Sequence, residues 1–318
     1  MISGIHHVTA IASDPQRNLD FYAGVLGLRL VKVTINYDDP GTYHFYYGDG
    51  LGRPGTIVTF FPWPGASRGR IGTGQVVSTN LSIPDGSAGW WRERLEKTGA
   101  TVATAGSGRP DDTALTFHDP DGMALILTEE GDEARPGWDG GDVPSDYAIR
   151  GLDSVSLEVA DGAKSRAMLT EVLGFTHESG DRFGAGDHRP GTGVYVCETR
   201  GATANRGLMG AGAVHHVAFR VADSDAEIEW REKLLAAGYH VSPQMDRQYF
   251  RSIYFREPGG VLYEIATDEP GFTTDETEEA LGSGLCLPQW LEPQREIIEQ
   301  HLPGITRPQP RVAAAPAS

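Results

Sequence analysis

The chain has 318 residues, a formal net charge of −17 at pH 7 and a pI of about 4.9. A surface this acidic disfavours nucleic acid and anionic membranes as partners. No apolar run approaches the roughly 18–20 residues that span a bilayer, and no secretory leader is recognisable after Met1. The two cysteines, Cys197 and Cys286, are too few for a disulfide framework, so we expect a reducing, cytoplasmic location.

The first 63 residues predict one βαβββ unit. Residues 5–11 form a strand-like run, and residues 14–27 predict a helix, because Asp14 can cap its start and Pro15 suits its first turn. Three further strand-like runs, punctuated by Gly or Pro, follow at 28–36, 43–48 and 56–63. The chain is long enough for two ordinary domains, or for one domain built from several such units.

Three more copies of this unit follow, with first strands near residues 76, 152 and 214. Their predicted helices cover 87–98, 163–173 and 225–237, and their closing strands lie within 119–129, 193–199 and 257–267. A glycine suited to positive φ comes at or after the end of every helix, namely Gly27, Gly99, Gly174 and Gly238. The fold class predicted is therefore α+β, with four βαβββ modules that form paired, curved, mixed sheets.

The modules predict three parts of the chain. Residues 1–135 hold the first pair of modules, and residues 146–270 hold the second pair. Residues 130–144 are rich in Gly, Asp and Pro and read as a linker. Residues 271–318 form a C-terminal extension, with a short amphipathic helix at 290–302 and a disordered tail from 307.

Comparison of the four copies singles out candidate metal ligands. The position before the central residue of each first strand holds His7, Ser78, Ser154 and His216, so only the outer copies carry imidazoles. In the last strands, Glu264 aligns with Thr59, Ile126 and, approximately, Cys197, so only the fourth copy carries a carboxylate. If the first copy packs beside the fourth, two imidazoles and one carboxylate meet at one site.

The two His-His pairs leave one choice open. Adjacent side chains of a strand point to opposite faces, so one histidine of each pair reaches a concave face, and alternation does not choose between His6 and His7, or between His215 and His216. Two imidazoles and one carboxylate leave coordination positions open, as in non-haem Fe(II) oxygenases, and Mn(II) suits the same donors.

Two residues upstream of Glu264 are weaker candidates. Arg247 can bind an anionic oxygen, and Tyr254 can donate a hydrogen bond to substrate, although a surface charge and a core aromatic are equally compatible with the sequence. The other histidines show no ligand spacing and are expected to be structural or exposed: His44, His118, His177, His188, His240 and His301.

Several segments also resemble a known family. They are GIHHVTAIASDPQRNLDFYAGVLGLRLVK (4–32), DDPGTYHFYYGD (38–49), PGTIVTFFPWPGA (54–66), VHHVAF (214–219), PGGVLYEIATDEPGF (258–272) and LPQWLEPQREIIEQHLP (287–303). On these segments the chain resembles the vicinal oxygen chelate superfamily, which includes glyoxalase I, extradiol dioxygenases and bleomycin- or fosfomycin-resistance proteins. More narrowly, it looks like the ring-cleaving dioxygenases that act on hydroquinones.

The resemblance implies roles for individual residues. It implies that His7, His216 and Glu264 are the metal ligands. It also implies supporting or catalytic roles for His6, His215, Arg247 and Tyr254. The implied partners are a small aromatic substrate and O2, and exposed strand edges of such modules predict a homo-oligomer.

Three functions are compatible with this pattern. The first is an Fe(II)-dependent, extradiol-type dioxygenase that cleaves hydroquinones or related dihydroxybenzenes. The second is a glyoxalase- or resistance-type enzyme, in which the metal polarises a substrate without O2. The third is a non-catalytic small-molecule-binding protein of the same fold. The sequence leaves open the ring substituents, the choice of Fe or Mn, the number of subunits and the position of ring cleavage.

Overall fold

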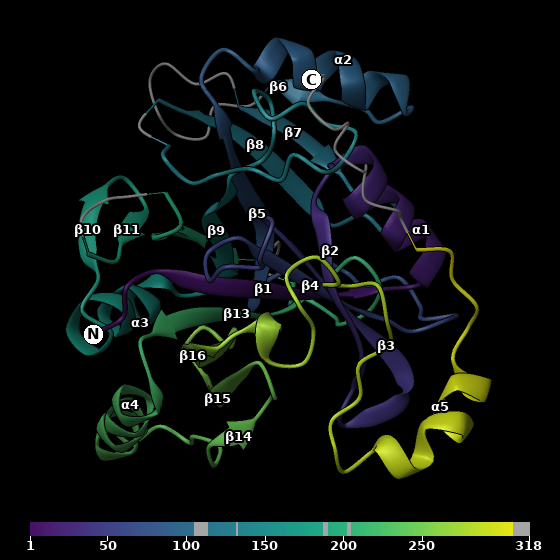
Figure 1. Cartoon of the computed structure of the whole chain (residues 1–318). Coiled ribbons are helices and arrows are strands. Elements are labelled where there is room, and N and C mark those ends of the chain that lie inside the picture. Colours follow the sequence, from purple (N-terminus) through teal and green to yellow (C-terminus); the bar gives the residue numbers. More distant parts are fainter. Residues whose placement is uncertain (105–113, 132, 187–189, 202–204, 308–318) are drawn as a thin grey trace.

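The computed structural model describes residues 1–104, 114–131, 133–186, 190–201 and 205–307. Two expectations lie outside these residues, namely the role of His188 and disorder in the tail from 308 to 318. Four βαβββ modules follow one another along the described chain, which confirms the predicted fold class (Figure 1).

Each module begins with a strand and a helix and ends with three strands. The first contains β1 (Ile5–Ala12), α1 (Pro15–Leu19), η1 (Asp20–Val25), β2 (Arg29–Asn36), β3 (Asp39–Gly48) and β4 (Ile57–Pro62). The second contains β5 (Gln75–Pro84), α2 (Ala88–Lys97), β6 (Ala103–Thr104), β7 (Leu115–His118) and β8 (Ala124–Glu130). The third contains β9 (Gly151–Val159), α3 (Gly162–Ala167), η2 (Met168–Val172), β10 (Thr176–Ser179), β11 (Arg182–Gly184) and β12 (Gly193–Glu198).

The fourth module and the extension complete the described chain. The module contains β13 (Val214–Val221), α4 (Ser224–Ala236), β14 (Met245–Asp246), β15 (Phe250–Arg256) and β16 (Leu262–Pro270). The extension contains η4 (Phe272–Thr274), η5 (Glu292–Gln294) and α5 (Arg295–His301). Both η5 and α5 fall within the range 290–302, where the sequence predicts an amphipathic helix.

The helices of the four modules end just before the predicted glycines, but two of them are not regular α-helices in their second halves. The four glycines expected at positive φ have φ of 68° (Gly27), 81° (Gly99), 78° (Gly174) and 88° (Gly238), a conformation that glycine adopts without steric cost. In modules one and three the helix widens into the π-helical turns η1 and η2, a change that the apolar pattern did not predict.

The modules pair across the chain into two eight-stranded mixed sheets. Modules one and four form the first sheet, in the order β14-β15-β16-β13-β1-β4-β3-β2. Modules two and three form the second, in the order β10-β11-β12-β9-β5-β8-β7-β6. The first residues of the chain therefore lie beside residues 214–270. Each sheet therefore combines one module from the expected first part (1–135) with one from the expected second part (146–270). The division of the chain into these parts remains a prediction.

The two sheets share one register at their centres. Val8 of β1 pairs with Val217 of β13, and Thr79 of β5 pairs with Val155 of β9, antiparallel in both cases. The register also shifts at equivalent points, which leaves His6 and His215 unpaired in the first sheet and Val77 and Asp153 unpaired in the second. Such β-bulges bend a strand and re-aim its side chains.

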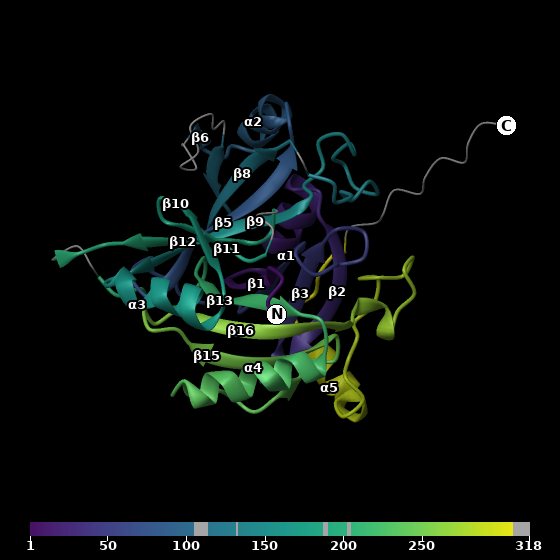
Figure 2. The ribbon, with the colours of Figure 1, turned by 90° about the vertical axis from the view of Figure 1, so that its left-hand side faces the viewer.

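Helices and the extension cover the outside of the sheets. Figure 2 shows α4 running along β15 and β16, and Figure 1 shows α2 at the opposite end of the molecule, beside β6–β8. The extension packs on module one, where the Tyr43 hydroxyl donates to the Pro303 carbonyl at 3.0 Å and Trp290 meets the ring of Tyr37. Among the described residues, no helix is long and apolar enough to cross a membrane.

Candidate metal centre and aromatic pocket

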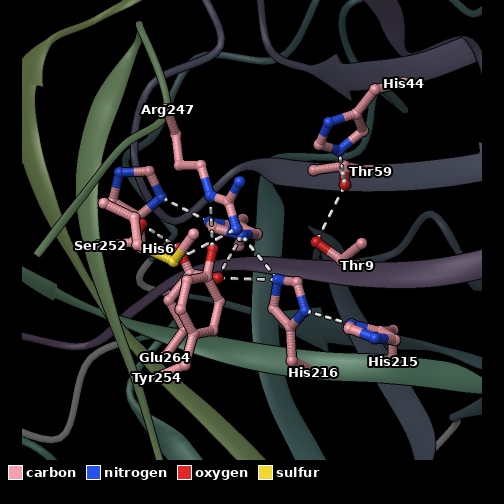
Figure 3. Close-up of polar contacts among 12 residues, drawn as sticks. His6, Thr9, His44, Thr59, His215, His216, Arg247, Ser252, Tyr254 and Glu264 are labelled. Carbon is pink, nitrogen blue, oxygen red and sulfur yellow. Dashed lines mark hydrogen bonds and ion pairs between the residues drawn. The ribbon is translucent and has the colours of Figure 1, made fainter. Parts of the chain in front are cut away.

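His7, His216 and Glu264 converge inside the first sheet. They lie on β1, β13 and β16, which are consecutive strands of that sheet, and all three side chains are buried. Glu264 Oε2 lies 2.8 Å from His216 Nε2 and 3.4 Å from His7 Nε2, and the two imidazole nitrogens are 3.3 Å apart (Figure 3). The structure thus places the first copy beside the fourth, and one donor atom of each residue lies within 4.8 Å of the others.

The β-bulges explain how both histidines of each pair enter the site. His6 and His215 are the extra residues of the two bulges, so simple alternation does not hold there. Their Nδ1 atoms lie 2.9 Å from His7 Nδ1 and 2.7 Å from His216 Nδ1, respectively. The second histidine of each pair faces Glu264, and the first contacts its neighbour from behind.

These contacts determine which ring nitrogen carries hydrogen. His6 Nε2 lies 3.1 Å from the Thr267 carbonyl, so it must donate, and burial lowers the pKa of His6 well below its usual value, so the ring is neutral. His6 Nδ1 is then a lone pair that accepts the Nδ1 hydrogen of His7. His7 Nε2 in turn presents a lone pair to Glu264, the tautomer that metal-binding histidines adopt.

The second pair allows the same arrangement. Burial lowers the pKa of His216, although Glu264 opposes this effect, and burial lowers the pKa of His215 to about 3. Both rings are therefore neutral near pH 7. If His216 Nδ1 donates to His215, His216 Nε2 also faces Glu264 with a lone pair.

The carboxylate completes a set of converging acceptors. Burial alone would raise the pKa of Glu264, but positive charge at the His7–His216 site holds it well below its usual range, so the carboxylate is ionised when a cation lies there. Oε1 accepts a hydrogen bond from Ser252, whereas Oε2 is buried and accepts none from the described residues. Two imidazole lone pairs and a carboxylate oxygen at 2.8–3.4 Å repel one another unless a cation lies among them, so this donor set fits a divalent metal.

A cavity of about 210 Å³ opens onto these three residues. Its polar wall carries Arg247 and Tyr254, and its apolar walls carry Phe61, Trp63 and Phe250. An apolar cavity of about 150 Å³ accommodates benzene, so this space suits a single aromatic ring.

The polar wall keeps a fixed charge and a neutral hydroxyl. Burial disfavours the charge of Arg247, but Tyr254, Asp38 and Glu264 together raise its pKa, so the guanidinium stays charged. Burial, reinforced by Glu264, raises the pKa of Tyr254, so its hydroxyl keeps its hydrogen. Arg247 Nε donates to the Tyr254 oxygen at 3.2 Å, so the Tyr254 hydrogen is directed away from Arg247.

His44 also lines this cavity, although the sequence suggested only a structural or exposed role. It lies on β3, with its ring against Tyr46 and Phe61. Sequence spacing could not reveal it, because His44 is far along the chain from the candidate ligands. Its strand β3 reaches the site only because β4 lies between β3 and β1 in the sheet. Thr9, two residues after His7 on β1, also lines the cavity and was missed because a threonine is not a typical metal ligand.

The register also corrects one alignment. Val155 of β9 pairs with Val194 of β12, just as Val217 pairs with Tyr263. The position equivalent to Glu264 in module three is therefore Tyr195, and not Cys197 as the sequence comparison had it. The equivalences with Thr59 and Ile126 agree with the register.

A second acidic cluster already contains a cation. Asp275, Glu276 and Cys286 lie close enough together to hold a metal. The buried Lys32 ammonium lies 2.6 Å from Asp275 Oδ1, 2.5 Å from Glu276 Oε2 and 3.8 Å from Cys286 Sγ. Burial raises the pKa of Cys286 to about 12, so its thiol keeps its hydrogen. This cluster is an internal ion pair of the extension with β2.

The chain is similar to proteins of one family over most of its length. The family model described as Glyoxalase/Bleomycin resistance protein/Dioxygenase superfamily matches residues 4–127 and 151–265. MhqO of Bacillus subtilis (strain 168), named as a candidate ring-cleaving dioxygenase, is 44% identical over 94% of this chain and 95% of its own length. The chlorohydroquinone/hydroquinone 1,2-dioxygenase of Sphingobium indicum is 34% identical over 92% of this chain and 93% of its own length.

Solved structures show the same similarity. The crystal structure of a candidate dioxygenase from Bacillus subtilis superposes with a TM-score of 0.91, at 43% identity, over 97% of this chain and 99% of that one. Glyoxalase I from Zea mays superposes with a TM-score of 0.61 at 18% identity, over 83% of this chain and 92% of that one, which is a likeness of fold.

Proposed function

Because the chain belongs to the glyoxalase/bleomycin resistance/dioxygenase superfamily, we propose that it is an Fe(II)-dependent dioxygenase that cleaves the ring of hydroquinones or related dihydroxybenzenes. The observation that carries the proposal is the convergence of His7, His216 and Glu264 at the floor of a ring-sized cavity. The names of the full-length relatives support the reaction class. Mn(II) is the alternative metal, since it suits the same donors.

In the proposed reaction, both atoms of O2 enter the product and one ring bond next to a hydroxyl-bearing carbon breaks. A divalent metal at His7, His216 and Glu264 would lower the pKa of a substrate hydroxyl and allow electron density to reach O2. The protein has to bind the ring, remove or supply protons and stabilise negative charge on oxygen.

The polar wall suits these tasks. Arg247 carries a fixed positive charge toward the cavity and can stabilise negative charge on substrate or on oxygen. Tyr254 can donate its hydrogen to the same oxygen, because Arg247 already occupies its acceptor side. His6 and His215 hold the ligand rings in the tautomer that leaves Nε2 free.

The test is anaerobic loading with Fe(II), followed by measurement of O2 uptake with hydroquinone, its methyl and chloro derivatives, and catechol. We expect uptake of one O2 per ring cleaved, with the fastest turnover for a 1,4-diol. Protein loaded with Mn(II) in parallel identifies the working metal. Protein that holds iron but takes up no O2 with any of these compounds contradicts the proposal, and turnover without O2 would instead indicate a glyoxalase-type reaction.

A further inference from the structure

A row of polar side chains crosses the first sheet and leads to the ligand His216. Tyr46 of β3 pairs with Thr59 of β4, Thr59 pairs with Thr9 of β1, and Thr9 pairs with His216 of β13. Four neighbouring strands therefore place these residues opposite one another. His44 stands two residues before Tyr46 on the same face of β3 and lines the cavity.

Hydrogen bonds connect this row into one string. The Tyr46 hydroxyl lies 2.9 Å from His44 Nδ1, and His44 Nε2 lies 2.8 Å from Thr59 Oγ1. Thr59 Oγ1 lies 2.9 Å from Thr9 Oγ1. Figure 3 shows the His44, Thr59 and Thr9 part of the string on the opposite side of His216 from Arg247 and Tyr254. The string thus reaches the cavity floor from the wall opposite the one that carries Arg247 and Tyr254.

The chemistry of His44 determines the direction of the string. Burial, reinforced by His7 and His216, lowers the pKa of His44 well below its usual value, so its ring has one N–H and one lone pair. A phenol is a stronger acid than a neutral imidazole, and an imidazole lone pair is the better acceptor, so Tyr46 donates to Nδ1. His44 Nε2 then donates to Thr59, and Thr59 donates to Thr9.

The string therefore ends in a donor at the cavity floor. Thr9 Oγ1 accepts from Thr59, and no described residue is assigned as the acceptor of the Thr9 hydrogen. Thr9 lines the cavity beside His7 and His216. A small anionic oxygen at this floor can thus receive a hydrogen bond from Thr9, from the side that Arg247 does not reach.

We propose that His44 is a positioning residue that, through Thr59, holds the Thr9 hydroxyl as a hydrogen-bond donor to the anionic oxygen of a bound dihydroxybenzene. This role rests on the proposed function, because it requires a phenolic ligand in the cavity. His44 lines the cavity and acts on the oxygen only through the two threonines.

Packing alone would be a different role for the same residue. The His44 ring lies 4.0 Å from the ring of Tyr46 and 4.3 Å from that of Phe61, centroid to centroid, so it also shapes the wall. His44→Phe keeps an aromatic ring and removes both hydrogen bonds. Thr59→Val keeps the shape of a buried side chain outside the cavity lining and removes the link to Thr9. His44→Gln keeps one acceptor and one donor and is the rescue variant.

The experiment measures anaerobic binding of 4-nitrophenol to metal-loaded protein, since its phenol and phenolate forms differ in visible absorption. We expect His44→Phe and Thr59→Val to bind the phenolate about ten-fold more weakly than wild type, as the loss of one hydrogen bond to a charged group implies. His44→Gln should bind within about two-fold of wild type. Metal content should be the same in all four proteins, and kcat/KM for hydroquinone should follow phenolate affinity.

The outcomes separate this inference from the proposed function. Wild-type affinity for phenolate in both His44→Phe and Thr59→Val overturns the role of the string, while O2 uptake by wild type leaves the proposed function standing. A loss in His44→Gln, with none in His44→Phe or Thr59→Val, would identify packing of the ring and also overturn it. If wild type itself takes up no O2 with hydroquinone, the proposed function fails. If His44→Phe does not fold, Thr59→Val carries the test.

Discussion

The two sheets share one backbone plan, yet among the described residues only the first presents converging candidate metal ligands. Both are built from two modules, both pair their central strands in the same register, and both contain β-bulges at equivalent positions. The frame that aims the ligands is therefore present twice. The side chains on that frame decide whether it can hold a metal.

In the second sheet, the positions equivalent to the three proposed ligands hold side chains that suit internal hydrogen bonds. Ser78, Ser154 and Tyr195 stand where His7, His216 and Glu264 stand in the first. Asn80 Nδ2 donates to Ser154 Oγ at 2.9 Å, and Ser154 Oγ donates to Asp153 Oδ2 at 2.6 Å. Hydroxyls and amides can be both donor and acceptor, so this cluster needs no added cation.

A fixed cation also belongs to the second sheet. Arg182 pairs with Tyr195, so it occupies the position that Tyr254 has beside Glu264. It forms an ion pair with Glu178, and its guanidinium lies 5.8 Å from the centre of the Tyr195 ring. The comparison indicates that one sheet uses its centre for stability, whereas the other leaves lone pairs facing one another for a ligand.

The largest loss of activity is expected when a candidate ligand of the first sheet is replaced by the residue at the equivalent position of the second sheet. His216→Ser introduces the residue that module three has at this position. It removes one of the three proposed ligands, and the loss of several kcal/mol of metal-dependent stabilisation corresponds to a decrease in kcat/KM on the order of 10³-fold. Metal analysis after dialysis and O2 uptake measure the change.

Ser154→Ala is the matched control in the second sheet. It should leave metal content and O2 uptake as in wild type, since Ser154 lies at the equivalent position of the other site. Full metal content in His216→Ser would show that His216 is not a ligand.

A smaller loss is expected when the bulge residue behind a ligand is removed. His215→Ala takes away the partner of His216 Nδ1 at 2.7 Å, so the ring of His216 loses its preferred orientation. Loss of such a supporting contact weakens metal affinity by about 10- to 100-fold. Titration with a competing chelator measures this affinity. Asp153→Ala, at the equivalent bulge, serves as control and should leave the affinity unchanged.

Arg182 and Arg247 should differ in what their loss affects. Arg182→Met removes a buried ion pair with the carboxylate of Glu178 and should lower the free energy of unfolding by about 3 kcal/mol, with O2 uptake unchanged below the melting temperature. Arg247→Met should lower kcat/KM by about 10²-fold with little change in stability, because its partner Asp38 is 68% exposed. Denaturant unfolding and O2 uptake are measured for both variants. If either variant lost stability and activity to the same extent, the division between the two arginines would be wrong.

Sequence reasoning predicted the fold and the meeting of the ligands because both depend on periodic features. Repeated element order and four helix-ending glycines are visible without coordinates, and equivalent positions of repeats stay equivalent in space. The metal-binding role of His7, His216 and Glu264 stays a prediction until metal is measured.

Other features depend on geometry that periodicity does not encode. The bulges at His6 and His215 break strict alternation, so the sequence alone could not choose a histidine of each pair. Module three has two glycines before its last strand: the one with positive φ is Gly191, which lies four residues before Tyr195 just as Gly260 lies four residues before Glu264, whereas Gly193 lies four residues before Cys197. His44 reaches the site through a row across three strands, which only the register reveals.

The helices that follow the central strands differ at one buried position. Asp223 caps α4 and Asp161 caps α3, and the fourth residue after each cap is fully buried: Glu227 in the first and Ser165 in the second. Ser165 Oγ donates to Glu257 at 2.7 Å. Glu227 accepts from Gln244 through Oε2, but its Oε1 is buried without a hydrogen-bond partner among the described residues.

The smallest predicted effect is a pH-dependent gain in stability from Glu227→Gln. Burial, reinforced by Glu264, raises the pKa of Glu227 to about 7, although Gln244 opposes this effect. The folded protein therefore retains a proton that the unfolded chain releases above about pH 4.5, so wild-type stability falls as pH rises toward 7. Glutamine removes this titration, and the variant should gain on the order of 1–3 kcal/mol relative to wild type between pH 5 and pH 8. Urea unfolding at both pH values measures the gain, and Ser165→Ala should show a difference from wild type that does not change with pH. A constant difference for Glu227→Gln would mean that Glu227 titrates alike in the folded and unfolded chain.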